Sequence, residues 1–292
     1  MIGSRQWRIA CALVSISAAL AAPPVAALPL DSRVPGGVAV LRLPKVSGTP
    51  HAWLDKQPVW VARSGSEWVA IVGIGLDTPP GPLALRVSDD TSDQFLPFEI
   101  TPKRYPEQRI TLKDASRVSL SPENEARAIR EIAEIQKIKR HWREEDGTDG
   151  KLAPPAEGRL VSRFGLRRFF NGEPRAAHSG QDIAVPRGTP VKAVAGGVVL
   201  AVGDYFFNGV TVFLDHGNGL ISMVCHLDRS DVEPGQHVLQ GQQVGQSGMT
   251  GRASGPHVHW SVVLNGTMVD PDLFLSAPRA KGSAPGEKRH GK

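Results

Sequence analysis

Five side chains that can bind a metal ion or transfer a proton lie in one segment of about eighty residues. His178 and Asp182 form an H-x3-D pair, and His226 stands alone about midway along the segment. His257 and His259 form an H-x-H pair that closes the set. Imidazole and carboxylate are common zinc ligands, and a catalytic zinc site needs only three protein ligands. The segment therefore predicts a metal site with further histidines available for proton transfer.

The elements that must position these side chains can be inferred from their neighbours. The stretch SGPHVHWSVVL is rich in β-branched and aromatic residues, which predicts a strand. Residues i and i+2 of a strand point to the same face, so His257 and His259 are expected to project into one cleft and Val258 away from it. A glycine between His178 and Asp182 favours a loop that leads into a strand.

The motifs that contain these residues, HSGQD, CHL and GPHVH, resemble the signature motifs of the lysostaphin/LytM-type zinc peptidases of family M23. The similarity runs from about Gly158 to Leu275. It includes SRFGLR, GTPVKAVAGGVV, VEPGQHVLQGQQVGQSGMTG and VDPDLFL, in that order. Family members often carry a tyrosine two residues before the middle histidine, where this chain has Val224. That departure concerns a packing or substrate contact and leaves the metal site intact.

The resemblance implies the role of each residue. His178, Asp182 and His259 are expected to hold one Zn²⁺, and His226 and His257 to be catalytic histidines that do not bind it. The implied function is zinc-dependent hydrolysis of the peptide cross-links of bacterial peptidoglycan, with D,D-endopeptidase action favoured. The alternative is a LytM-like activator of cell-wall amidases that has lost its zinc ligands, but all five positions are filled here.

Residues 1–27 resemble a secretory signal peptide, with two arginines before an apolar run and small residues at its end. The apolar run from Ile9 to Ala22 is short of the ~20 residues that a membrane-spanning helix needs, although an uncleaved anchor is the alternative. We therefore expect an exported protein without stable membrane insertion, periplasmic rather than secreted. Only Cys225 would remain after cleavage, so no internal disulfide is expected.

The charge of the chain is unevenly distributed. The whole sequence carries +5, of which residues 1–27 contribute +2 and the tail from Ser276 contributes +4, leaving −1 for residues 28–275. The part expected to fold is therefore not basic, and no nucleic-acid partner is predicted. Residues 276–292 are expected to be a disordered basic tail.

The predicted fold class is mainly β. Short apolar or alternating runs separated by turn signals predict a β-sandwich-like N-terminal domain over residues 28–110. Trp53, Trp60 and Trp68 lie in it and are interpreted as core residues, the alternative being a ligand platform or wall-binding module. Short apolar runs and dense glycines predict an antiparallel-β M23-type domain over residues 158–275, with a groove across one face.

Residues 111–157 are predicted to connect the two domains. Ser121 followed by a proline predicts the start of a helix that reaches residue 145, with an apolar stripe of isoleucines ending at Trp142. The composition of residues 146–155, DGTDGKLAPP, is typical of a linker. This architecture also suggests that the N-terminal region docks on the catalytic domain and restrains its site.

Other reactive side chains have simpler interpretations. Cys225 adjoins His226, which raises a Cys–His nucleophilic pair as an alternative chemistry. Adjacent strand residues face opposite sides, so the thiol is expected to point into the core. His216 and His237 lie in turns and are not expected to be ligands, and Asp270 before a proline is expected to shape a loop.

Overall fold

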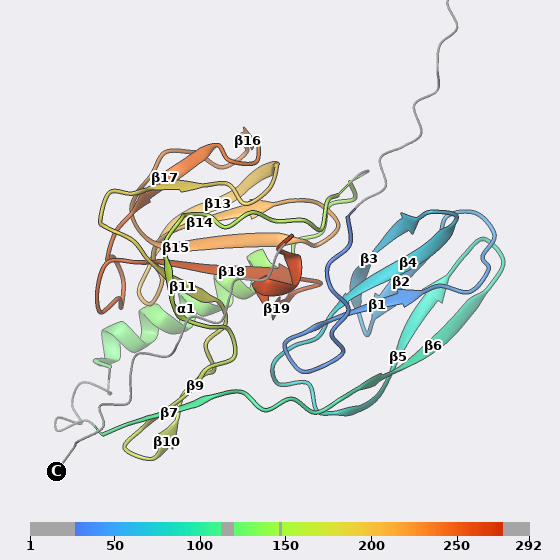
Figure 1. Cartoon of the computed structure of the whole chain (residues 1–292), viewed down its shortest axis with the longest axis horizontal. Coiled ribbons are helices and arrows are strands. Elements are labelled where there is room, and N and C mark those ends of the chain that lie inside the picture. Colours follow the sequence, from blue (N-terminus) through green and yellow to red (C-terminus); the bar gives the residue numbers. More distant parts are fainter. Residues whose placement is uncertain (1–26, 112–119, 146–147, 277–292) are drawn as a thin grey trace, which may run out of the picture.

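The computed structural model describes residues 27–111, 120–145 and 148–276 (Figure 1). The predicted signal peptide lies outside the described residues apart from Ala27, and so does the predicted tail apart from Ser276. Within the described ranges the chain forms two β-sheet modules with one long helix beside the second of them.

The N-terminal module is a single antiparallel sheet that curls on itself (Figure 1). Its strand order is β1-β4-β3-β2-β5-β6. The strands are β1 (Val38–Arg42), β2 (His51–Leu54), β3 (Gln57–Ser64), β4 (Glu67–Gly73), β5 (Gly81–Ser88) and β6 (Asp93–Ile100). Because β2 pairs with both β3 and β5, the sandwich-like arrangement is one continuous sheet. Leu41, Val72 and Phe98 from distant strands share one core inside the curl.

The C-terminal module is a ten-stranded antiparallel sheet (Figure 1). Its main path is β16-β13-β14-β15-β18-β11-β8. The strands are β8 (Arg159–Ser162), β11 (Gln181–Ala184), β12 (Pro190–Lys192), β13 (Gly197–Tyr205), β14 (Gly209–Asp215), β15 (Ile221–Ser230), β16 (His237–Val238), β17 (Gln243–Ser247), β18 (Val258–Leu264) and β19 (Thr267–Val269). The core side of β18 is formed by alternate residues, Val258, Trp260 and Val262. The predicted antiparallel-β class is confirmed.

The two modules share a hydrophobic interface. In β4, Ala70 and Val72 belong to the core inside the curl, whereas Ile71 belongs to the same cluster as Val262 and Leu264 of β18. Successive strand residues face opposite sides, so β4 is apolar from Trp68 to Val72 because both its faces are covered there. The N-terminal module therefore packs against the C-terminal module through this strand, as expected from the sequence.

A second connection between the modules runs along their edge. Strand β7 (Glu107–Ile110) follows the N-terminal sheet in the chain and pairs in parallel with β9 (Arg167–Phe170) (Figure 1). Strand β9 also pairs with β10 (Glu173–Pro174), so the three strands form a separate small sheet. The N-terminal region thus adds a strand to the hairpin that precedes His178. Restraint of the site by this region stays a prediction.

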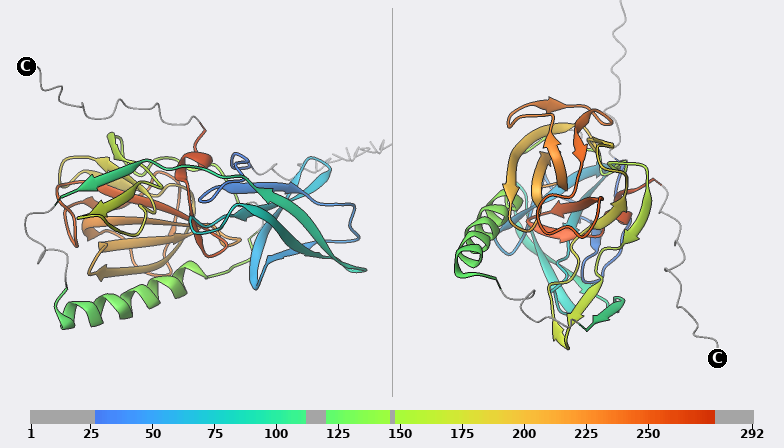
Figure 2. Two further views of the ribbon diagram at one scale, coloured as in Figure 1. Left: turned by 90° about the horizontal axis from the view of Figure 1, so that it is seen from below. Right: turned by 90° about the vertical axis from the view of Figure 1, so that its left-hand side faces the viewer.

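Helix α1 (Pro122–Lys139) lies along the C-terminal sheet (Figures 1 and 2). Its N-cap is Ser121, as predicted, with the hydroxyl accepting from the amide of Asn124. The helix ends at Lys139, so the predicted extension to residue 145 is wrong. Within the described ranges, no helix is long and apolar enough to cross a membrane.

The predicted isoleucine stripe is only partly buried. Ile135 and Ile138 pack against the sheet, whereas Ile129 and Ile132 are 61% and 48% exposed. Three residues of an α-helix turn it by about 300°, which is about 60° short of a full turn. After the three such steps from Ile129 to Ile138 the difference is about 180°, so these two side chains lie on opposite sides of the helix. The packed side includes Glu131, whose carboxylate accepts from the backbone amide of Phe206 at 2.6 Å.

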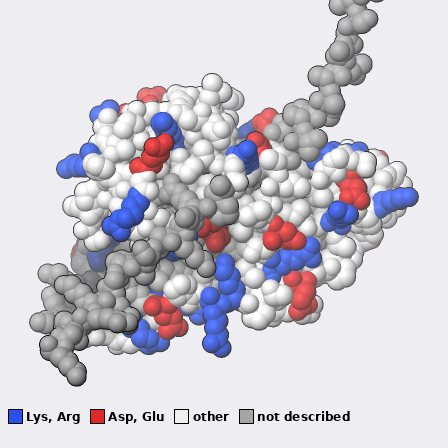
Figure 3. Space-filling model, viewed as in Figure 1, with Lys and Arg blue, Asp and Glu red and all other residues white. Residues whose placement is uncertain are grey.

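Residues 148–155 of the predicted linker pack against the folded part through alternate residues, while Asp149 and Lys151 are exposed. Leu152 is 2% exposed, and its amide donates to the carbonyl of Phe274 at 2.8 Å. Gly150 donates to Ala27 and so holds the first described residue in place. On the face shown in Figure 3, basic and acidic side chains are interspersed, in agreement with the balanced charge of the folded part.

Candidate metal centre and the histidines around it

The candidate site forms where β11 and β18 pair. Asp182 of β11 stands opposite His259 of β18 in the antiparallel register, so both side chains lie on one face of the sheet. His178 lies in the loop that enters β11, as predicted. Gly180 of this loop is a steric requirement, because a Cβ there would lie 2.7 Å from Nε2 of His259 and 2.4 Å from the carbonyl oxygen of Trp260. The missing side chain lets the loop approach the strand closely.

Three donor atoms converge at this point. Nε2 of His178 lies 3.1 Å from Oδ1 of Asp182 and 3.1 Å from Nδ1 of His259. The Asp182 oxygen and the His259 nitrogen are 2.8 Å apart. Tetrahedral zinc bonds of about 2.0–2.2 Å would separate ligand atoms by roughly 3.3–3.6 Å. The three residues therefore form a group that can hold a small metal ion, with shifts of a few tenths of an ångström.

The outward nitrogen of each histidine is engaged elsewhere. Nδ1 of His178 donates to the carbonyl of Arg163 at 2.9 Å, and Nε2 of His259 donates to the hydroxyl of Ser261 at 2.8 Å. A neutral imidazole has one N–H, so these bonds leave a lone pair on each of the two inward nitrogens. Metal-binding histidines in proteins usually have such outer partners.

Electrostatics keeps the site suited to a cation. Burial opposes the charge of Asp182, but the neighbouring imidazoles of His178 and His259 outweigh it and hold the pKa of the carboxyl well below its usual range. Burial lowers the pKa of His259, which favours its neutral form. At neutral pH the group therefore offers one carboxylate together with the unprotonated imidazole of His259.

His226 stands beside this group in a strained backbone conformation. Its φ of 61° lies in the left-handed region, and the pairing of β15 with β14 shifts register around it. The amide of His226 donates to the carbonyl of Asn208, and its Nδ1 donates to the carbonyl of Thr250 at 2.9 Å. Burial lowers the pKa of His226 to about 4. The neutral ring thus keeps Nε2 as a free acceptor.

His257 completes the cluster from the residue before β18. Its ring centroid lies 4.7 Å from that of His226, and its Nε2 lies 3.8 Å from Oδ1 of Asp182. Its Nδ1 donates to the carbonyl of Gly255 at 2.8 Å. The predicted shared face of His257 and His259 is confirmed, and Val258 is fully buried on the other side.

Comparisons with known proteins agree with this arrangement. The family description "Peptidase family M23" matches residues 176–271, and "Peptidase family M23 N-terminal domain" matches residues 31–103. A crystal structure of a peptidase M23 from Pseudomonas aeruginosa is 42% identical and has a TM-score of 0.73, covering 85% of this chain and 97% of that one. The chain belongs to peptidase family M23.

Curated M23 relatives resemble this chain over the catalytic segment. The peptidoglycan DD-endopeptidase ShyA of Vibrio cholerae is 39% identical over 113 residues, which are 38% of this chain and 26% of the relative. The DD-carboxypeptidase/endopeptidase Mpg of Neisseria meningitidis is 36% identical over 120 residues, 41% of this chain and 28% of that protein. The chain therefore matches about a quarter of the length of these relatives.

The other reactive side chains of the M23 module lie outside the site. Cys225 is fully buried, and burial raises the pKa of its thiol to about 12, so it is neither exposed nor ionised as a nucleophile must be. His216 is buried between the hydroxyl of Ser222 and the carbonyl of Gly196, and Asp270 caps a short 3-10 helix, Pro271–Phe274. None of these side chains joins the donor group.

Several residues that support the M23 site were not identified from the sequence. Ser261, Thr250 and the carbonyl of Arg163 each fix one histidine ring. Ser261 is the only one with a sequence signal, since it lies two residues after His259 on the same face of a strand. The others come from loops whose positions depend on the whole fold.

Proposed function

We propose that this chain is a zinc-dependent peptidoglycan hydrolase that cleaves peptide cross-links, with D,D-endopeptidase action favoured. The observation that carries the proposal is the convergence of His178, Asp182 and His259 on one point, with two further histidines beside it. Two imidazoles and one carboxylate are a donor set typical of catalytic zinc in peptidases. Zinc bound there would acidify a water molecule and polarise a substrate carbonyl.

The remaining steps belong to His226 and His257. Each ring donates through Nδ1 to a backbone carbonyl, which fixes its orientation and directs Nε2 to the cluster. One ring accepts at Nε2 the proton released by the attacking water, and a ring protonated at Nε2 can donate to the negative charge that develops on the scissile carbonyl oxygen. The two rings share these roles, and either can serve as the base.

The substrate assignment rests on the relatives and on the expected location. Two curated relatives that resemble the catalytic segment are named for DD-endopeptidase activity. An exported, periplasmic protein would meet a thin wall that presents D-alanyl cross-links. A non-catalytic activator of amidases is disfavoured, because it would not need a complete donor group with outer hydrogen-bond partners.

The test uses zinc-loaded protein lacking residues 1–27. Purified sacculi are digested and the fragments separated by chromatography. We expect cross-linked dimeric muropeptides to be converted to monomers, and Asp182→Ala to abolish the conversion. Persistence of dimers together with cleavage of pentaglycine-bridged walls would reject the D,D assignment. Absence of any cleavage by the zinc-loaded protein, with amidase activation in its place, would support the alternative.

A further inference from the structure

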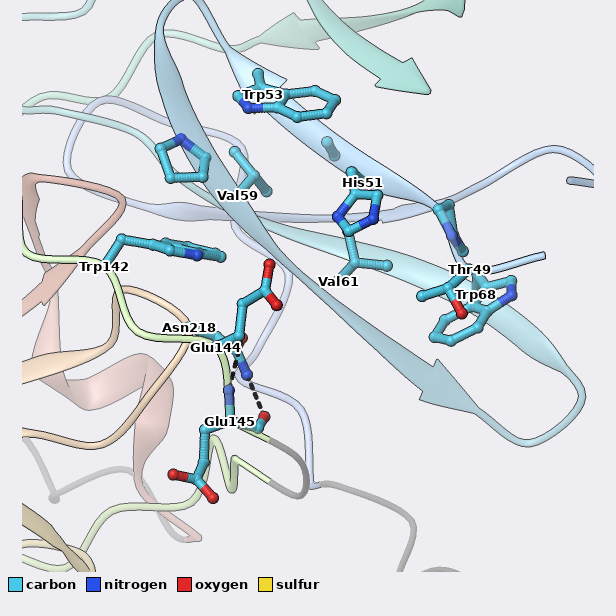
Figure 4. A pocket seen from close by; sticks show the side chains of 13 residues that line it. Thr49, His51, Trp53, Val59, Val61, Trp68, Trp142, Glu144, Glu145 and Asn218 are labelled. Atoms are coloured by element: carbon cyan, nitrogen blue, oxygen red, sulfur yellow. Dashed lines mark hydrogen bonds between the residues drawn. The ribbon is translucent and has the colours of Figure 1, made fainter. Parts of the chain in front are cut away.

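A cleft of about 410 Å³ lies between the N-terminal sheet and the segment that follows α1 (Figure 4). Strands β2, β3 and β4 form one wall, and Trp142, Glu144 and Asn218 form the other. Neither the metal donors nor His226 and His257 line it. The cleft is therefore separate from the site described above.

Three tryptophans of this cleft are half-buried, and each is in contact with a neighbouring residue. The guanidinium of Arg86 lies 4.1 Å from the ring centroid of Trp53, and that of Arg63 lies 3.8 Å from the ring of Trp68. Trp142 packs on Gly219, where a Cβ would lie 3.0 Å from its ring. By contrast Trp60 is 1% exposed and belongs to the core. The expectation that all three tryptophans of the N-terminal module are core residues therefore holds for Trp60, is met in part by Trp68, which packs against the core inside the curl, and is wrong for Trp53.

The polar side of the cleft offers a carboxylate without a partner. Glu145 is paired with Arg143, and its backbone is fixed by two hydrogen bonds with the Asn218 amide, at 2.7 and 3.4 Å. The adjacent Glu144 makes no hydrogen bond or ion pair within the described part of the chain. In Figure 4 its carboxylate points between the ring of Trp142 and the strand that carries Val59 and Val61. A strong acceptor thus faces the open space between aromatic rings.

We propose that this cleft binds a sugar ring of the peptidoglycan glycan strand. Pyranose rings have flat apolar faces that pack on aromatic rings, and hydroxyl groups that donate to carboxylates; the cleft provides both. The guanidinium groups of Arg63 and Arg86 lie over the rings of Trp68 and Trp53, so one face of each ring is already occupied by a cation and the other remains for a ligand. This inference depends on the proposed function for one point, that the polymer is peptidoglycan.

The position of the cleft fits a second contact with one polymer. Asn218 lies in the turn before β15, whereas His226 is the sixth of the ten residues of that strand. At about 3.3 Å per residue, the five steps from Ile221 to His226 alone extend over roughly 17 Å. A glycan strand can occupy the cleft while a stem peptide attached to it reaches the metal centre. Simultaneous contacts on one polymer raise the apparent affinity of each.

The test measures binding of zinc-loaded protein lacking residues 1–27 to glycan strands stripped of stem peptides, through intrinsic tryptophan fluorescence. We expect Trp142→Ala and Glu144→Gln each to weaken binding by about five- to tenfold. Phe95→Ala is the matched control, since Phe95 is 70% exposed on the same module and does not line the cleft. Glu144→Gln changes an exposed side chain without changing its shape, so loss of folding does not obscure its result.

Two outcomes would overturn the inference. One is unchanged glycan affinity in both variants, or no binding of peptide-free strands by the wild-type protein. The other is competition by free stem peptide as effective as by glycan, which would assign the cleft to the peptide. Cleavage of soluble muropeptide dimers, measured in parallel, separates this inference from the proposed function. It should be unchanged in Trp142→Ala and Glu144→Gln, and its absence in the wild type would reject the hydrolase proposal alone.

Discussion

The side-chain amide of Asn265 pairs with both backbone polar groups of Gly73. Oδ1 of Asn265 accepts from the amide of Gly73 at 2.5 Å, and Nδ2 donates to its carbonyl at 3.2 Å. Asn265 lies in the turn between β18 and β19, and Gly73 ends β4, so this pairing joins the two modules at their buried interface. Asn265 has φ 40°, a left-handed conformation that asparagine tolerates better than most residues.

We expect Asn265→Gly to lower the free energy of unfolding by about 1–3 kcal/mol, because it leaves two buried backbone groups without partners. Because glycine adopts the left-handed conformation readily, the loss of stability measures the contribution of the Asn265 side-chain amide. Asp55→Gly is the matched control, since Asp55 has φ 53° and is exposed in the β2–β3 turn. Urea unfolding measures both. Equal effects of the two substitutions would show that the pairing contributes nothing to stability.

Asp182→Ala is expected to remove most of the bound zinc, since it takes the only carboxylate from the donor group. Metal content is measured by atomic emission after dialysis against limiting zinc. The melting temperature gives an independent readout, because a ligand that binds only the folded state raises it. Zinc should raise the melting temperature of Asp204→Ala, an exposed control in β13, and not that of Asp182→Ala. Stoichiometric zinc in Asp182→Ala would disprove the ligand set.

His226→Ala and His257→Ala are each expected to keep zinc and to lose about 100-fold or more in hydrolysis. Neither ring belongs to the donor group, and each is oriented by a backbone carbonyl so that Nε2 is free. His237→Ala is the control, because His237 is exposed on β16 and belongs neither to the donor group nor to the histidine pair beside it. Metal content and dimer cleavage are measured on the same samples. Near-normal turnover in either variant removes that histidine from the mechanism.

The stability of the protein should fall as pH decreases below about 6.5, partly because of His216. Burial lowers the pKa of this histidine, which is held neutral between Ser222 and Gly196. A depressed folded-state pKa means that the unfolded chain binds the proton first, so the contribution is complete above about 6.5 and is lost as pH falls towards the folded-state pKa.

His216→Asn should therefore reduce the loss of unfolding free energy between pH 7.5 and pH 5.5, although it lowers stability at pH 7.5 by leaving the Ser222 hydroxyl poorly paired. Urea unfolding at the two pH values measures the difference. His237→Asn is the control, because it removes an exposed histidine whose protonation is not opposed by burial. The idea fails if His216→Asn and wild type lose the same stability on acidification.

Much of the fold and of the site could be predicted because it depends on local patterns. The alternation of β18 assigns His257 and His259 to one face and Val258 to the other, whatever the rest of the chain does. Ser121 and the proline after it start α1 through their own backbone preferences. The donor types were likewise visible, since two imidazoles and a carboxylate in one segment form a donor set that divalent metal ions such as zinc take in proteins.

The tertiary structure alone decided the features that join distant segments. The backbone amide of His226 is held by the carbonyl of Asn208 and its ring by the carbonyl of Thr250, and only the folded loops bring these two groups near it. The half-buried positions of Trp53 and Trp68, in contrast to the buried Trp60, depend on which face of the curled sheet meets the other module. Sequence periodicity gives the direction of a side chain relative to its own strand. It does not say which faces another segment covers, because burial is a property of the assembled layers.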